Sequence, residues 1–288
     1  MVSSKNNRIF IWKDFKEWKL ALEDMFKDIL TPELKVKIKK NAARIEYCDD
    51  RIECEELIGQ SIEEMITMQK INELRQRYSH IRAYHACRTD DVSSYYEKGV
   101  LPSIAVKDFQ VDRFREIFLS GDFPELTEEK LQQSIEEVDK KDEDLCLIID
   151  DRVIIECWGH YLIYGSEYLS GLVSNLPIEN SKEKYLPVLR NIGKPTVIEI
   201  NFPNTIEYVS DCVIWEVFER MITEWVYIVA HSRMESSPFD CTISLLKPLL
   251  PKHICSHYHP RKIRDSILEV DKIYDAETGE YEEQNSEE

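Results

Sequence analysis

The amino-acid sequence predicts an α+β protein with a helical N-terminal segment and a mostly antiparallel core. Apolar residues recur at helical spacing over the first 78 residues, which contain almost no glycine or proline, whereas several later runs alternate as strands do. Between two strand runs, residues 105–144 are charged and helical in pattern, so they resemble an insertion. A chain of 288 residues with 43% hydrophobic content can bury a sizeable core.

Two helices begin the N-terminal segment. Between Trp12 and Leu30, apolar residues recur at intervals of three and four among charged ones, which predicts an amphipathic helix. Thr31-Pro32-Glu33 then supplies an N-cap, a proline at the first helical position and an early acid. We expect a second helix there, and further helices to about Tyr78.

The pattern changes at Ser79. Residues 80–88 predict a short strand, and residues 91–98 predict a helix that Gly99 ends as its C-cap. The insertion should form two or three surface helices, one of them starting at Thr127.

Residues 145–172 are the most informative stretch. Two apolar, β-branched runs flank Asp150-Asp151, which predicts a hairpin with an acidic turn. The strand that carries Gly159-His160-Tyr161-Leu162 is expected to stop at Gly165, and a helix should open near Ser166. One aromatic ring and one hydroxyl would then lie at a sheet edge, where a small ligand could rest.

The later elements are simpler to assign. Residues 196–202 alternate as a strand that stops at Pro203, and residues 239–246 predict a last strand. Residues 213–230 follow a helical repeat, although their second half could equally be a strand. Residues 251–254 begin a turn or a short helix.

The charge distribution limits the partners. A net charge of −18 disfavours general nucleic-acid binding, because duplex affinity depends largely on Lys and Arg neutralising phosphates. Half of this charge lies in residues 265–288, which we expect to be a solvated acidic tail that could bind a basic protein partner.

The sequence also points to a cellular compartment. The eight cysteines show no paired spacing, no signal peptide opens the chain and no apolar run approaches the length of a membrane span. We therefore expect a cytoplasmic protein with reduced thiols and no membrane partner.

Motifs for several other chemistries are missing. The sequence contains no GxGxxG, GxxxxGK[ST], GxSxG or HExxH, which argues against a Rossmann-type dinucleotide site. Cys255-x-His257-x-His259 places metal-type ligands at alternate strand positions, but no second pair supplies the rest of a tetrahedron, so we expect no metal site.

Two sequence motifs follow one another at a spacing that is typical of a known family. Tyr84-His85 at the end of a strand is followed by a helix and by Gly99-Val100-Leu101, fourteen residues after the histidine. The second motif is the segment GHYLIYGSEYL, residues 159–169, and a late strand follows it. In this order and spacing the chain resembles the histidine-tyrosine-glutamate branch of the ADP-ribosyltransferase superfamily. That branch includes poly(ADP-ribose) polymerases and RNA 2'-phosphotransferases, and the resemblance covers about residues 79–264.

The resemblance implies a core of two small sheets that form a cleft for NAD. It implies that His85 hydrogen-bonds a ribose hydroxyl and that Tyr161 stacks on the nicotinamide ring. Ser166 would donate to the nicotinamide amide, Tyr168 or Tyr164 would supply a second ring face, and Arg88 could hold a phosphate.

The third member of the family's catalytic set is altered. Cleavage of NAD builds positive charge on the ribose, so the site needs an anion beside it. The family's glutamate begins the late strand, where this chain has Asp240, a shorter carboxylate that we assign the catalytic role. Glu167 is a further carboxylate, although at a helix N-terminus it also simply complements the dipole.

The sequence thus predicts three parts. A helical segment occupies residues 1–78, an ADP-ribosyltransferase-like core occupies residues 79–264 with its insertion at 105–144, and an acidic tail occupies residues 265–288. The expected function is transfer of ADP-ribose from NAD to a protein or nucleic-acid acceptor, as in a bacterial toxin or defence effector. The alternative is a catalytically degenerate module that binds NAD, another nucleotide or a protein.

Overall fold

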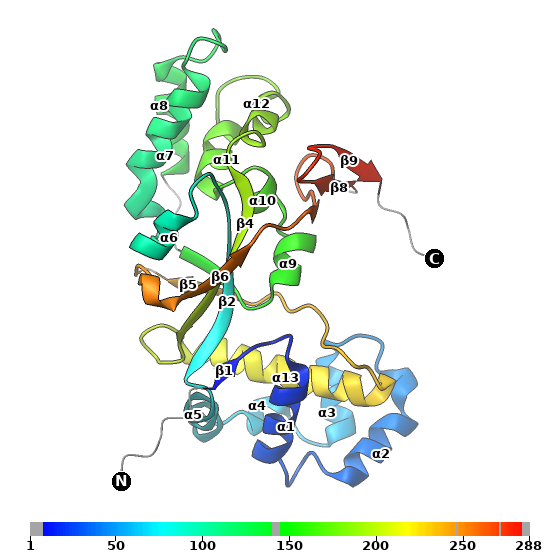
Figure 1. Ribbon diagram of the computed structural model, residues 1–288. Coiled ribbons are helices and arrows are strands. Elements are labelled where there is room, and N and C mark those ends of the chain that lie inside the picture. Colours follow the sequence, from blue (N-terminus) through cyan, green and yellow to red (C-terminus); the bar gives the residue numbers. More distant parts are fainter. Residues whose placement is uncertain (1–7, 140–144, 246, 271, 284–288) are drawn as a thin grey trace, which may run out of the picture. The chain divides into compact units, whose positions relative to one another are not determined.

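The computed structural model describes residues 8–139, 145–245, 247–270 and 272–283, and it confirms the α+β class. These residues form thirteen α-helices, and their strands make a six-stranded and a three-stranded sheet (Figure 1). The chain divides into two compact units. Unit 1 comprises Met1–Ala83 and Asn201–Ile243, and unit 2 comprises Tyr84–Ile200 and Ser244–Glu288.

Unit 1 is mainly helical. Its elements are β1 (Ile9–Phe10), α1 (Phe15–Met25), α2 (Pro32–Lys40), the 3-10 helix η1 (Ala42–Arg44), α3 (Arg51–Ile58), α4 (Ile62–Met65), α5 (Met68–Arg77) and α13 (Asp211–His231). Three strands contribute residues to both units: β2 (His80–Thr89), β4 (Lys194–Pro203) and β5 (Thr242–Leu245).

The first two helices are confirmed together with the residues that start and bury them. The face of α1 that carries Phe15, Trp18 and Leu22 is buried, as its apolar spacing requires. Thr31 Oγ1 accepts a hydrogen bond from Leu34 N at 3.2 Å, so Thr31 is the N-cap of α2, with Pro32 at the first position.

Helix α13 is the centre of unit 1, because α1 to α5 all pack against it. It is helical to His231, which settles the alternative of a strand in its second half. Its buried residues are apolar except for Thr223 and Glu224. Glu224 is fully buried and accepts a hydrogen bond from Ser237 N at 2.8 Å. The carboxylate thereby satisfies a buried loop amide that would otherwise be unpaired.

Unit 2 holds most of the sheet and the remaining helices. Its helices are α6 (Ser93–Lys98), α7 (Ser103–Phe118), α8 (Glu128–Val138), α9 (Asp151–Glu156), α10 (His160–Ile163), α11 (Glu167–Ser174), α12 (Ser181–Leu189) and the 3-10 helix η2 (Pro251–His253). Its strands are β3 (Leu145–Ile148), β6 (Ile254–Tyr258), β7 (Lys262–Arg264), β8 (Lys272–Asp275) and β9 (Tyr281–Glu283).

The larger sheet has the strand order β5-β3-β2-β4-β6, and β1 pairs in parallel with the start of β2. The registers of β2 with β3 and of β4 with β6 are antiparallel, with Tyr84 opposite Ile148 and Val197 opposite Tyr258. The smaller sheet, β7-β8-β9, is antiparallel throughout. The expectation of a mostly antiparallel core is therefore confirmed.

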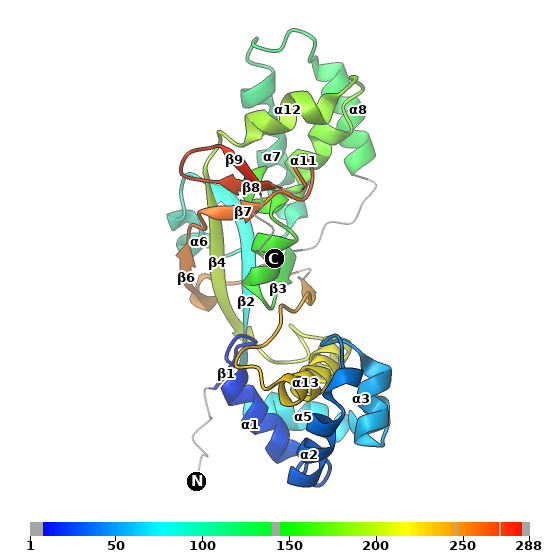
Figure 2. The ribbon, with the colours of Figure 1, turned by 90° about the vertical axis from the view of Figure 1, so that its right-hand side faces the viewer.

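Helices cover both faces of this sheet in unit 2. Residues directly opposite each other on paired strands have their side chains on the same face, so Tyr84 and its partner Ile148 share one face. They belong to the hydrophobic core that also contains Leu162 of α10 and Leu172 of α11. Figure 1 shows α6 on one side of β2 and α9 and α10 on the other, and Figure 2 shows β6, β4, β2 and β3 next to one another in the order of the sheet.

The first and second motifs contain the predicted helix ends. Gly99 has φ 82° and ends α6, and a Cβ at this position would meet Leu249 O at 1.8 Å, so only glycine fits. Ser166 Oγ accepts from Leu169 N at 3.2 Å and caps α11. Thr127 caps α8 within the predicted insertion, and residues 140–144 of that insertion lie outside the described residues.

The hairpin predicted around Asp150-Asp151 is wrong. Strand β3 ends at Ile148, and α9 begins at Asp151 with Asp150 as its N-cap, whose carboxylate accepts from Arg152 N at 3.2 Å. Aspartate is favoured both in tight turns and at helix N-caps, and sequence alone does not separate the two uses.

The strand predicted to carry Gly159-His160-Tyr161-Leu162 is also wrong, because these residues form the short helix α10 and its N-cap. The helical turn buries Leu162 and Ile163, which are adjacent in sequence, whereas a half-buried strand would bury alternate residues. A Cβ on Gly159 would lie 2.0 Å from Arg264 O, so the glycine permits β7 to approach this turn.

Residues 265–270 and 272–283 are folded, in contrast to the expected solvated tail, and residues 284–288 of that tail lie outside the described residues. Asp265 is fully buried and accepts hydrogen bonds from the hydroxyls of Tyr164 and Tyr281, the latter at 2.6 Å. The guanidinium of Arg190 lies over both tyrosine rings, 5.3 and 4.8 Å from their centroids. The acidic residues of β8 and β9 are therefore interspersed with aromatic residues that dock the small sheet on the rest of unit 2.

Candidate functional site

His85 lies on β2 and faces α6. Its ring centroid is 6.4 Å from that of Tyr95 on α6, and its Nδ1 lies 3.4 Å from the carbonyl oxygen of Cys146 on the neighbouring strand. Its surroundings lower the pKa of His85 by desolvation, which outweighs the raising effect of the Cys146 carbonyl. The side chain is half-buried and neutral at pH 7.

Arg88 lies three residues further along β2 and faces the other way. Its guanidinium donates to four backbone carbonyls, which include Leu162 O at 2.8 Å, Ile192 O at 2.9 Å and Gly193 O at 2.8 Å. The hydrogen bond to Leu162 joins the strand of the first motif directly to the helix of the second. The guanidinium is thus engaged with the protein's own backbone, rather than presented to a phosphate.

The predicted pair, His85 and Tyr161, is divided by the sheet. Arg88 and Tyr84 point to the side of α10, and alternation along β2 sends His85 to the side of α6. Tyr161 belongs to α10. The two motifs meet through backbone and arginine contacts, but the two side chains do not converge.

Tyr161 belongs to a row of three neighbouring rings, Trp158, His160 and Tyr161, which we call the ring ladder. His160 and Tyr161 have ring centroids 4.1 Å apart with an interplanar angle of 34°, and the Trp158 and His160 centroids are 5.9 Å apart. Trp158 is 37% exposed, which is unusual for so large an apolar ring. The Tyr161 hydroxyl donates to Glu167 Oε2 at 3.0 Å, so a carboxylate ends the ladder.

His160 is held in place and kept neutral. Its Nδ1 lies 2.9 Å from Ser266 Oγ, in the loop after β7. Burial lowers the pKa of His160, and the nearby carboxylates of Glu167 and Asp265 only partly oppose this effect. The ladder therefore presents three uncharged rings next to one negative charge at pH 7.

Ser166 and Tyr168 are used inside the protein. Ser166 donates to Gln110 Oε1 while it caps α11. Tyr168 is buried in the hydrophobic core, and its hydroxyl donates to Asp139 Oδ1 at 3.3 Å. Neither side chain extends the ring ladder.

Asp240 is exposed and belongs to unit 1, whereas His85 and Tyr161 belong to unit 2. It lies two residues before β5, whereas the predicted strand of residues 239–246 included it. Glu167 is the carboxylate that contacts Tyr161 within unit 2.

Sequence reasoning missed Trp158 and His160 as partners of Tyr161. The signal that could have found them is the concentration of rings in Trp-Gly-His-Tyr, since an exposed run of aromatic residues is unusual. The strand prediction hid it, because alternation would have sent His160 and Tyr161 to opposite faces.

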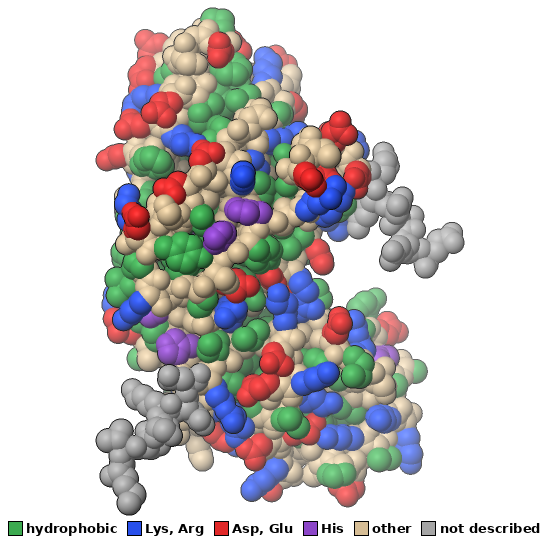
Figure 3. Space-filling model, in the orientation of Figure 1, with side chains coloured by type: hydrophobic (Ala, Val, Ile, Leu, Met, Phe, Trp, Pro, Cys, Tyr) green, Lys and Arg blue, Asp and Glu red, His purple; other side chains and the backbone are tan. Residues whose placement is uncertain are grey.

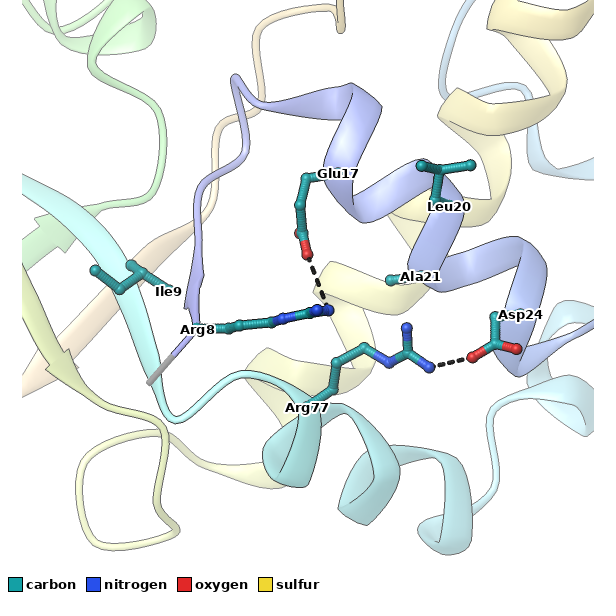
Figure 4. Close-up of a pocket in the computed structure, with 7 residues that line it drawn as sticks. All are labelled: Arg8, Ile9, Glu17, Leu20, Ala21, Asp24 and Arg77. Carbon is teal, nitrogen blue, oxygen red and sulfur yellow. Dashed lines mark hydrogen bonds and ion pairs between the residues drawn. The ribbon is translucent and has the colours of Figure 1, made fainter. Parts of the chain in front are cut away.

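A separate depression of about 510 Å³ lies in unit 1 between β1, α1 and α5 (Figure 4). Its charged side chains neutralise one another in pairs, Arg8 with Glu17 at 3.7 Å and Arg77 with Asp24. It is lined by Arg8, Ile9, Glu17, Leu20, Ala21, Asp24 and Arg77. Because no net charge remains, the depression has no preference for an anionic ligand such as a nucleotide.

The described residues contain no group of three or more His, Cys, Asp or Glu side chains that could hold a metal ion. Across the same residues, no helix has both the length and the apolar character that a membrane span requires. Comparisons with protein-family models, with curated proteins and with solved structures found no match.

Proposed function

We propose that the chain is an ADP-ribosyltransferase-like protein that binds NAD on the exposed side of α10 and the start of α11. The observation that carries this proposal is the ladder Trp158–His160–Tyr161 with Glu167 at its end. His160, Tyr161 and Glu167 lie within the segment that resembles the family's second motif, and Trp158 immediately precedes it.

The chemistry of the ladder suits a nicotinamide or adenine ring. Planar bases stack on aromatic side chains with a gain of about 1–3 kcal/mol per base. Oxidised nicotinamide is positively charged, so the neutral His160 ring does not repel it and the Glu167 carboxylate attracts it. Positive charge that develops on the ribose would be stabilised by the same carboxylate.

The geometry favours binding over efficient transfer. His85 faces away from α10, and the carboxylate that contacts Tyr161 is Glu167 rather than Asp240. Transfer to a protein or nucleic-acid acceptor in the cytoplasm is the second candidate function. It is supported by the hydrogen bond from Arg88 to Leu162 O, which joins the two motif segments.

Calorimetric titration with NAD tests the binding proposal. We expect one NAD per chain and at least about a tenfold loss of affinity in Tyr161→Ala, because one stacking partner is removed. Tyr47→Ala is the matched control, since Tyr47 is 66% exposed in unit 1 and should be neutral. Absence of binding heat, or equal losses in the two variants, would reject the proposal.

Nicotinamide release from NAD tests the second candidate. If Glu167 stabilises the charge on the ribose, Glu167→Gln should bind NAD but release nicotinamide more slowly, whereas Asp240→Asn should behave as wild type. If no release occurs with any acceptor tested, the binding-only function is favoured.

A further inference from the structure

Two histidines lie together at the end of the edge strand β6, far from the ring ladder in sequence. His257 belongs to β6 and is opposite Ile198 of β4, and His259 is the first residue after the strand. Their ring centroids are 5.5 Å apart. Figure 3 shows two neighbouring histidine side chains on the surface where β6 runs in Figure 1.

The protein fixes the tautomer of His259. Its Nδ1 lies 2.9 Å from the carbonyl oxygen of Pro195, which can only accept a hydrogen bond. Thr196 Oγ1, at 3.1 Å, donates its own proton to Lys194 O and therefore also accepts from Nδ1. The proton of the neutral ring is thus on Nδ1, and the lone pair is on Nε2.

His257 has a comparable anchor. Its Nδ1 lies 2.9 Å from the hydroxyl oxygen of Tyr96 on α6, which can accept the Nδ1 proton. Among the described residues, none is hydrogen-bonded to Nε2 of either His257 or His259. Metal-binding histidines in proteins are typically oriented in this way, with the second nitrogen donating to a carbonyl or another acceptor.

The separation of the rings fits a shared metal ion. Imidazole nitrogen binds Zn²⁺ at about 2.0–2.1 Å, so two imidazoles on one tetrahedral ion have centroids about 5 Å apart. The observed centroid distance of 5.5 Å requires only a small side-chain adjustment.

We propose that His257 and His259 form a two-imidazole site for a borderline divalent cation such as Zn²⁺ or Ni²⁺. Imidazole is the ligand type that these ions prefer, whereas Mg²⁺ and Ca²⁺ prefer oxygen ligands. The described residues offer no third side chain in a ligating group, so water or an external ligand completes the coordination. The site is therefore open, and its cation can accept a further ligand.

Titration of the full chain with Ni²⁺ alone, in buffer with a reductant that contains no thiol, tests the site. We expect one equivalent of Ni²⁺ to bind, and His257→Ala and His259→Ala each to weaken binding more than about tenfold. His231→Ala is the matched control, because His231 is exposed at the end of α13 in unit 1. Tyr96→Phe should cause a smaller loss through the orientation of His257.

Two results would overturn the proposal. One is Ni²⁺ binding that persists in the variant lacking both histidines, or that is absent from the wild-type chain. The other is loss of binding in Cys255→Ser without loss in the histidine variants, which would assign the ion to the exposed Cys255 thiol. Circular dichroism of each variant confirms that the fold is retained, which is expected because neither histidine is buried.

Discussion

Replacing Tyr281 with phenylalanine should loosen the small sheet β7-β8-β9 from the rest of unit 2. The change removes one hydroxyl, which donates to the buried carboxylate of Asp265 at 2.6 Å. It keeps the ring that packs against Tyr274 and lies under the Arg190 guanidinium. The effect therefore measures mainly the hydrogen bond to the buried charge, together with the longer contact to the Tyr164 hydroxyl at 3.3 Å.

The loss in free energy of unfolding caused by Tyr281→Phe follows from the hydrogen-bond partners that Asp265 retains. A hydrogen bond to a charged group contributes about 1.5–3 kcal/mol to the free energy of unfolding. Asp265 keeps the hydroxyl of Tyr164 and the amides of Ile267, at 2.8 Å, and Leu268, at 3.2 Å. We expect a loss of about 2 kcal/mol, which corresponds to a fall in Tm of about 4–8 °C for a unit of this size.

The loss of stability in Tyr281→Phe should depend on pH. Burial alone would raise the pKa of Asp265, but the hydrogen bonds from Tyr164 and Tyr281 and from two backbone amides hold it below its ordinary value. A carboxyl whose pKa is depressed in the folded state adds stability above its unfolded pKa of about 3.9, and this contribution is lost as the pH falls through the folded value. The difference between wild type and Tyr281→Phe should therefore be constant from pH 7 to about 5 and should shrink below about 4.

Hydrogen exchange of residues 262–283, followed by mass spectrometry, reports this docking locally, and thermal unfolding gives the global effect. Tyr227→Phe is the control, because its hydroxyl, in unit 1, accepts only from exposed Arg233 at 3.3 Å and should contribute less than about 0.5 kcal/mol. Unchanged exchange in residues 262–283, or equal destabilisation by both variants, would refute the role assigned to Asp265.

Two other substitutions test the packing. Glu224→Ala should lower the free energy of unfolding of unit 1 by about 3 kcal/mol. The substitution leaves the buried Ser237 amide without its acceptor and Arg220 without its carboxylate partner. A loss below about 1 kcal/mol in urea unfolding would contradict this. Gly159→Ala should cost about 1–3 kcal/mol because the added methyl would meet Arg264 O at 2.0 Å, whereas Gly171→Ala, with 3.5 Å to its nearest neighbour, should be neutral or stabilising. Equal melting temperatures for the two glycine variants would show that the approach of β7 is unimportant.

Local signals allowed much of the fold to be predicted. The capping residues Thr31, Thr127 and Ser166 each start the helix that was expected after them, because their hydrogen bonds depend on neighbours three residues away. The errors arose where the same residue types serve two structures. Asp150 caps a helix instead of closing a turn, and residues 265–283 fold because Tyr274 and Tyr281 supply apolar surface among the acids.

The site was less predictable than the fold. The sequence predicts Tyr161 as a candidate site residue, but its ring partners Trp158 and His160 depend on a helical turn that the sequence did not indicate. The separation of His85 from Tyr161 depends on which face of β2 meets α10. That choice is set by long-range packing of Tyr84 and Arg88, and alternation along a strand does not say which face lies inward.

The most direct test of NAD binding at α10 and α11 is hydrogen exchange of the full chain with and without saturating NAD. We expect slower exchange in residues 158–174 when NAD is present, and no such change in the Tyr161→Ala variant. Unaltered exchange in residues 158–174 at saturating NAD, or protection confined to residues 201–243, would contradict it.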